Sequence, residues 1–164
     1  MSNQVWKILQ KPDTVVVFDV DGTLFSYNYG TYHAYHDLDD GRAVIDFDFY
    51  KDAKSIPVIR EYVDRHGIYQ CYCLSQETHG LEECKSNAIE RLYRIPRDRH
   101  IYTKKPADKV VELKKIRSAI SKNRYIVFVD DKDDTLGIAR DYFKTDPSVC
   151  TAHVTIFFEE HENE

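Results

Sequence analysis

Short segments rich in apolar residues alternate along this chain with longer segments whose apolar residues recur every three or four positions. The short segments predict strands at 14–20, 68–75, 100–103, 125–129 and 153–158. The longer segments predict helices at 54–65, 80–93, 106–120 and 135–143. Strands that alternate with helices predict an α/β fold, with a doubly wound, largely parallel sheet that is covered by helices on both faces.

Length and composition narrow the class of protein. The chain has 164 residues, of which 42% are hydrophobic and 31% charged, so we expect one globular domain over residues 1–164. The net charge of −5 argues against bulk binding to nucleic acid or to an anionic membrane. No apolar run is long enough for a membrane span, and the four cysteines lack metal-binding spacing. We therefore expect buried, reduced thiols and a cytoplasmic protein without a membrane partner.

Acidic residues follow two of the predicted strands. Asp19 and Asp21 end the first strand, and Asp130, Asp131 and Asp134 follow the fourth. Because ligands of open α/β sheets bind at the carboxyl ends of the strands, these side chains should lie along one edge. Carboxylates that converge in this way repel one another unless a cation lies between them. Oxygen ligands of this kind favour Mg²⁺, which also binds substrate phosphate, over zinc or copper.

The same edge offers the parts of a phosphoryl-transfer site. A carboxylate oxygen of Asp19 can act as a nucleophile, and Asp21 can protonate the leaving oxygen and then activate water. Gly22 permits a tight turn and a close approach of backbone amides to phosphate. The second strand ends in Ser75, whose hydroxyl can bind the phosphoryl group.

Four short motifs resemble those of the haloacid dehalogenase (HAD) superfamily, in its phosphatase form. They are "DVDGT" from Asp19, "CLSQE" around Ser75, "KVVEL" from Lys109 and "VFVDDKDDT" around Asp130. They occur in the order typical of the family and span residues 14 to about 143.

The resemblance implies a role for each matching residue. Asp19 would be the nucleophile and a metal ligand, and Asp21 the acid/base, with its backbone carbonyl on the metal. Asp131 would be the direct ligand of the fourth motif, with Asp130 in support and Asp134 as an alternative. The candidate phosphate-binding residues are Gly22, Thr23, Ser75, Gln76 and a lysine. Lys109 is preferred as that lysine, although a Lys-Pro pair in some relatives would select Lys105.

The family often has a cap domain, but neither the interval from Asp21 to Ser75 nor that from Ser75 to Lys105 is long enough for a full one. The chain therefore resembles a capless member with an enlarged flap at about 25–50. An open site of this kind can admit a phosphorylated macromolecule, or a neighbouring subunit can close it in a homo-oligomer. Segment 27–42 is rich in tyrosine and also holds His33, His36 and Asp37, for which we expect no metal site. The flap tyrosines can stack on a substrate, form a dimer contact or simply pack.

Other functions fit the sequence less well. Receiver domains of signalling systems also place acids, a hydroxyl and a lysine on a doubly wound sheet, but their acid pair and phospho-acceptor lie on different strands. A catalytically idle HAD-like binding or regulatory scaffold would not need both Asp19 and Asp21. The sequence therefore predicts an enzyme, a Mg²⁺-dependent phosphatase with an aspartyl-phosphate intermediate. Its substrate stays open and includes phosphoproteins and nucleic-acid ends.

Overall fold

The sheet consists of five parallel strands in the order β3-β2-β1-β4-β5. The computed structural model describes residues 2–25, 47–77 and 80–161. Its strands are β1 (Val15–Phe18), β2 (Cys71–Gln76), β3 (His100–Thr103), β4 (Ile126–Asp130) and β5 (Val149–His153). This arrangement confirms the predicted α/β fold with a parallel sheet. Since β1 lies at the centre, between β2 and β4, the chain winds outward in both directions from it, and its carboxyl end is where a ligand crevice is expected.

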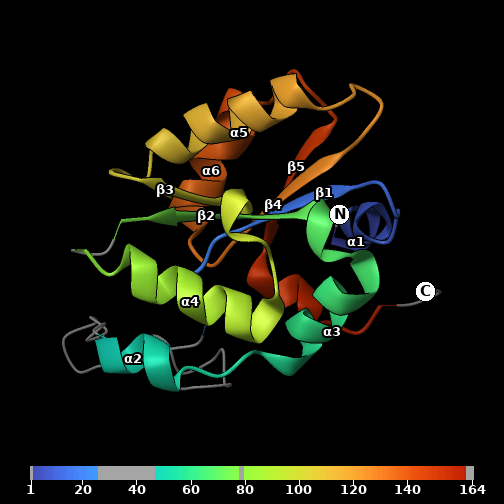
Figure 1. Cartoon of the computed structure of the whole chain (residues 1–164). Coiled ribbons are helices and arrows are strands. Elements are labelled where there is room, and N and C mark those ends of the chain that lie inside the picture. Colours follow the sequence, from blue (N-terminus) through green and yellow to red (C-terminus); the bar gives the residue numbers. More distant parts are fainter. Residues whose placement is uncertain (1, 26–46, 78–79, 162–164) are drawn as a thin grey trace.

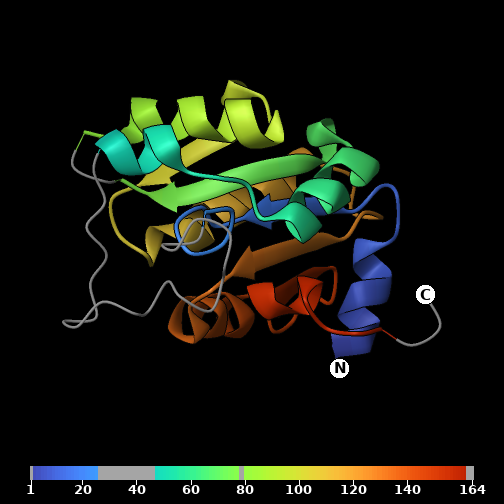
Figure 2. The same cartoon turned by 90° about the horizontal axis from the view of Figure 1, so that it is seen from below.

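Helices cover both faces of the sheet (Figures 1 and 2). They are α1 (Ser2–Leu9), α2 (Phe47–Asp52), α3 (Pro57–His66), α4 (Glu82–Tyr93), α5 (Asp108–Ala119) and α6 (Asp133–Tyr142). Val16 and Phe18 of β1 join a core cluster with residues of α1, α2, α3 and α4, whereas Val15 and Val17 join a second cluster with α5 and α6. Successive residues of β1 therefore face opposite layers, which explains why this strand is apolar throughout.

The last predicted strand is wrong. Strand β5 ends at His153, and Val154–Phe157 forms the 3₁₀ helix η4 instead. The backbone N–H of Thr155 donates to the His153 side chain, which starts the turn. The apolar residues of η4 are buried, and η4 lies beside α1 (Figure 2). The rings of Trp6 and Phe157 meet there edge to face, with centroids 5.9 Å apart. The apolar run that predicted a strand is therefore explained by burial of a 3₁₀ helix against α1.

Two further helices were not predicted from the sequence. Helix α1 precedes β1, and α2 occupies the end of the proposed flap at about 25–50. The rest of that flap, including His33, His36, Asp37 and the tyrosines around them, lies outside the described residues. Helix α3 begins at Pro57, later than the predicted start at residue 54, since proline is favoured in the first turn of a helix. Among the described residues, no helix has the length and apolar character that crossing a membrane requires.

Candidate active site

The chain makes a tight loop directly after β1. The amide of Asp19 still donates to Val129 O of β4 at 2.8 Å, and the amides of Leu24 and Phe25 then fold back onto Val20 O. Gly22 adopts a positive φ of 83°, and a β-carbon at this position would lie 2.5 Å from Oδ2 of Asp131. Glycine is therefore required both by the backbone conformation and by the close approach of a carboxylate.

Asp19 is paired with Lys109 of α5. Lys109 Nζ donates to Oδ1 of Asp19 at 2.7 Å, and the hydroxyl of Thr23 donates to Oδ2 at 3.2 Å. Burial raises the pKa of Asp19, but the charge of Lys109 and the hydrogen bonds from Asp131 and Lys109 together outweigh it, so that the pKa lies below its usual range. The aspartates that face Lys109 raise its pKa in spite of burial. Asp19 is therefore held as a carboxylate beside a permanent cation.

Three carboxylates meet at this point. Ligand atoms of Asp19, Asp130 and Asp131 lie within 4.8 Å of one another, and all three residues are buried. Burial, together with the charge of Asp19, raises the pKa of Asp130 to about 6 and that of Asp131 to about 10. Oδ1 of Asp131 is buried without a hydrogen-bond partner. Carboxylates in such surroundings, one of them with an unpartnered oxygen, have the donor chemistry of a Mg²⁺ site.

Asp21 lies apart from this acidic triad, among different partners. Oδ2 of Asp21 accepts from Lys85 Nζ of α4 at 2.7 Å, and Oδ1 accepts from the hydroxyl of Tyr50 of α2 at 2.8 Å. Lys85 is fully buried, whereas the Asp21 side chain is 17% exposed. The two aspartates of the first motif are thus charge-compensated by different lysines, which is the arrangement that two different chemical roles would need.

Ser75 and Gln76, at the end of β2, also contact Lys85. Lys85 Nζ donates to the Ser75 hydroxyl at 2.9 Å and to the backbone carbonyl of Gln76 at 3.1 Å. The side-chain amide of Gln76 points elsewhere and donates to Lys104 O at 3.2 Å. Ser75 therefore lies at the site through its side chain, and Gln76 through its backbone.

Two sequence candidates lie outside this arrangement. The Lys105 side chain is exposed in the loop before α5, whereas Lys109 reaches Asp19. Asp134 is exposed on the first turn of α6 and does not belong to the acidic triad. Both residues neighbour the site in sequence, but Lys105 lies in the loop before α5, and the helix periodicity of α6 turns Asp134 toward the exposed side.

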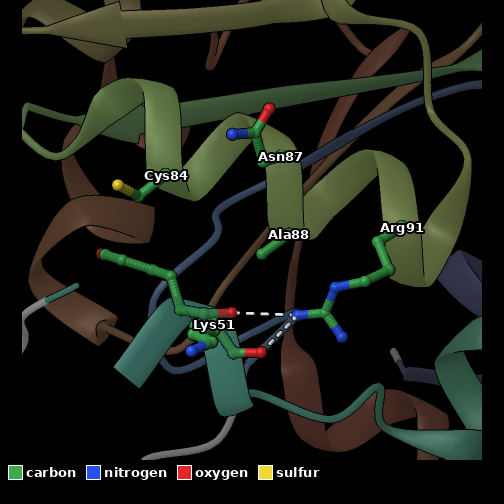
Figure 3. A pocket seen from close by; sticks show the side chains of 6 residues that line it. Lys51, Cys84, Asn87, Ala88 and Arg91 are labelled. Carbon is green, nitrogen blue, oxygen red and sulfur yellow. Dashed lines mark hydrogen bonds between the residues drawn. The ribbon is translucent and has the colours of Figure 1, made fainter. Parts of the chain in front are cut away.

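Arg91 of α4 fixes the end of α2. Its guanidinium Nη2 donates to Tyr50 O at 3.0 Å and to Lys51 O at 3.1 Å (Figure 3). A cavity of about 180 Å³ opens beside this contact, lined by side chains of α2 and α4. Carbonyls at a helix end lack partners within the helix, so Arg91 caps α2 from its neighbour. Helix α4 thereby positions Tyr50 as well as supplying Lys85.

Sequence reasoning missed three side chains at the site: Lys85, Tyr50 and His153. Lys85 had a detectable signal, since it lies four positions before the buried Ile89 and so on the inner face of its helix. A lysine on an apolar helix face needs a charged partner. His153 takes part from β5, where its Nε2–H donates to Asp131 O at 3.0 Å. Neither Tyr50 nor His153 had a local pattern that pointed to the site.

Comparison with protein-family models gives no match, and comparison with curated proteins gives none either. Among solved structures, the chain is similar to the HAD domain of the effector protein Lem4 from Legionella pneumophila, with a TM-score of 0.47 and 12% sequence identity. The similarity covers 86% of this chain and 84% of that chain. The function is therefore inferred from the chemistry of the site.

Proposed function

We propose that this chain is a Mg²⁺-dependent phosphatase that forms an aspartyl-phosphate on Asp19. The observation that carries the proposal is the buried acidic triad, whose ligand atoms lie within 4.8 Å of one another beside Lys109. Asp19, Asp130 and Asp131 would hold the ion, and the unpartnered Oδ1 of Asp131 would gain a partner in it. The ion would supply positive charge against the carboxylates and the substrate phosphate.

The reaction would run in two displacements at phosphorus. In the first, a carboxylate oxygen of Asp19 forms a bond to phosphorus, the ester P–O bond breaks, and Asp21 gives its proton to the departing oxygen. In the second, water attacks the phosphorus of the aspartyl-phosphate while Asp21 takes a proton from it, and the bond to Asp19 breaks. Inorganic phosphate leaves, and both aspartates return to their starting states.

The remaining residues would stabilise charge on the transferring phosphoryl group. Lys109 provides a buried cation next to the nucleophile. The Ser75 hydroxyl donates to Gln76 O at 3.2 Å and would turn from it to the phosphoryl group. The amides of Gly22 and Thr23 donate to Phe25 O and Val20 O and so are already used within the loop. The substrate class stays a matter for experiment. A panel of sugar phosphates, nucleotides, phosphopeptides and phosphorylated DNA or RNA ends would identify it.

Phosphate release from p-nitrophenyl phosphate tests the proposal. We expect release that depends on Mg²⁺ and stops with chelator. Asp19→Asn keeps the size of the side chain but removes the nucleophile, so activity should fall by orders of magnitude. An Asp19→Asn variant that keeps more than about a tenth of the rate, a barrier change under about 1.4 kcal/mol, would contradict the covalent role. Wild-type protein without Mg²⁺-dependent release would favour the idle scaffold instead.

A further inference from the structure

Lys85 connects two strand ends at the candidate site. Its ammonium has three N–H donors, and among the described residues it donates to Oδ2 of Asp21 at 2.7 Å, Oγ of Ser75 at 2.9 Å and the carbonyl of Gln76 at 3.1 Å. Asp21 follows β1, whereas Ser75 and Gln76 end β2. One buried cation from α4 therefore fixes the Asp21 carboxyl group relative to the neighbouring strand.

Tyr50 holds the other oxygen of the same carboxyl group. Its hydroxyl donates to Oδ1 of Asp21 at 2.8 Å, and its side chain is almost fully buried at 1% exposure. With one donor on each oxygen, the carboxyl group of Asp21 has a fixed orientation. Each carboxylate oxygen still has a further lone pair, so both contacts leave room for a proton on the exposed side.

Within the described part of the chain, Lys85 and Lys109 donate hydrogen bonds to different residues. Lys109 donates to Asp19 and Asp130, whereas Lys85 donates to Asp21 and to β2. A lysine kept for the transferring phosphoryl group would be expected beside the nucleophile, where Lys109 lies. The partners of Lys85 instead indicate a role in placing the acid/base.

We propose that Lys85 and Tyr50 form a clamp that positions the carboxyl group of Asp21 for proton transfer to the leaving group and from water. This inference rests on the proposed phosphatase function. Both are positioning residues, because they act through Asp21. General acid–base catalysis contributes about 10²–10⁴-fold to a rate and depends on hydrogen-bond geometry. A carboxyl group of Asp21 that is no longer held in this orientation should therefore lower the rate by part of that amount.

A series of ring-substituted phenyl phosphates separates this role from others. p-Nitrophenolate leaves readily without a proton, whereas phenolate, whose conjugate acid resembles tyrosine with a pKa of about 10, depends on the acid. The esters have similar shapes, and kcat/KM reports the steps up to departure of the phenol. A misplaced Asp21 should therefore make kcat/KM fall more steeply along the series.

We expect Tyr50→Phe and Lys85→Met to lose about tenfold more kcat/KM with phenyl phosphate than with p-nitrophenyl phosphate. Tyr62→Phe is the matched control, because Tyr62 is equally buried but its hydroxyl donates to Leu9 O in another part of the core. That variant should keep the wild-type ratio between the two esters. Equal losses on both esters in the clamp variants would overturn the inference and indicate a phosphate-binding or purely structural role.

Urea unfolding tests the clamp without any turnover. Lys85→Met and Asp21→Asn each remove one partner of the same ion pair, so their shifts in the unfolding midpoint should not add in the double variant. Additive shifts would show that the contact is absent and overturn the clamp. Tyr50→Phe keeps the ring in its place, so this variant should fold even if Lys85→Met does not.

The two proposals fail in different ways. Wild-type protein that hydrolyses neither ester with Mg²⁺ would overturn the proposed function, and with it the catalytic role of the clamp. Wild-type protein that is active, together with clamp variants that show an unchanged leaving-group dependence, would overturn the clamp alone.

Discussion

Lys105 and Lys109 lie four positions apart in the sequence, yet only Lys109 is placed at the site. Lys109 is 5% exposed and bonds to Asp19 and Asp130, whereas Lys105 is exposed. Removal of one preorganised donor to a developing anion typically lowers kcat about 10²–10³-fold. We therefore expect Lys109→Met to lose at least about a hundredfold in turnover of p-nitrophenyl phosphate.

Lys105→Met is the matched control, since it removes the same charge from the same stretch of chain. Its turnover should stay near that of the wild-type protein. If the two variants had equal effects on turnover, the choice of Lys109 as the lysine of the site would be wrong. Both variants are compared at a temperature where circular dichroism shows them folded, because Lys109→Met also leaves two buried carboxylates without their cation.

A substitution of Asp131 tests whether the acidic triad binds Mg²⁺. Without a cation, burial and the charge of Asp19 hold the pKa of Asp131 near 10, so an ionised carboxylate is unfavourable there. At neutral pH the folded, metal-free protein must therefore keep Asp131 protonated, whereas the unfolded chain would ionise it. Asn is neutral without this proton, so we expect Asp131→Asn to raise the melting temperature of the metal-free protein by a few degrees. The same variant should respond less to Mg²⁺. For the wild type, a hundredfold excess over Kd corresponds to about 2.7 kcal/mol of stabilisation.

Thermal melting with and without Mg²⁺ measures both effects. The wild-type shift corresponds to about 5–10 °C for a domain of this size. A chelator that leaves both the activity and the melting temperature of the wild type unchanged would contradict the Mg²⁺ assignment. Ca²⁺ is a useful comparison, because it binds oxygen ligands but requires a larger shell.

Most strands and helices could be predicted from the sequence, because the side chains that each element buries are apolar and recur at regular spacing. Strand β1 is apolar throughout since both of its faces are covered, and Gly67 marks the end of α3, although the start of α3 was predicted three residues too early. Strand β5 has a mixed pattern, with intermediate burial at four of its five positions, and so was predicted too late in the chain. Its register with β4 comes from long-range pairing that no local window contains.

The candidate site was also predictable only in part. Five candidate residues lie at or directly after the carboxyl ends of neighbouring parallel strands, so topology alone brings them to one edge: Asp19, Asp21, Ser75, Asp130 and Asp131. Tyr50 and Lys85 come from helices that pack on one face of the sheet, and their approach to the site depends on how α2 packs on α4. That packing is set by tertiary contacts rather than by spacing along the chain.

Arg91 offers a test of that packing. Its guanidinium holds the last carbonyls of α2, and α2 presents Tyr50 to Asp21. We expect Arg91→Ala to loosen α2 and to reproduce the leaving-group dependence of Tyr50→Phe in a weaker form. Hydrogen exchange should become faster at the amides of α2 and stay unchanged in β1.

Arg97→Ala is the comparison for Arg91→Ala. Arg97 also pairs with residues of α4, but on its outer side, where it binds Glu83 and Glu90. Surface ion pairs of this kind contribute little, so this variant should leave both the exchange of α2 and the kinetics unchanged. An Arg91→Ala variant with wild-type kinetics would mean that Tyr50 reaches Asp21 without this support.

For the whole molecule, two histidines link stability to pH. The Nε2–H of His66 donates to Thr14 O at 2.7 Å, and that of His100 donates to Ile95 O at 2.8 Å. Burial lowers the pKa of both below the usual 6.5. Below that pH the unfolded chain binds more protons than the folded protein, so the free energy of unfolding contributed by these groups falls as the pH drops.

Asp130 and Asp131 act in the opposite direction, so the contribution of the histidines is measured as a difference between two proteins. Burial raises the pKa of Asp130 to about 6, which makes its contribution to stability rise as the pH falls. We therefore compare the wild type with a His66→Gln/His100→Gln variant by urea unfolding between pH 8 and pH 5, with Mg²⁺ kept constant. The two stability curves should run parallel above about pH 7.5 and converge below about pH 6.5, because only the wild type takes up protons there on unfolding at these two positions. Curves that stay parallel down to pH 5 would mean that both histidines titrate alike in the folded and unfolded chain.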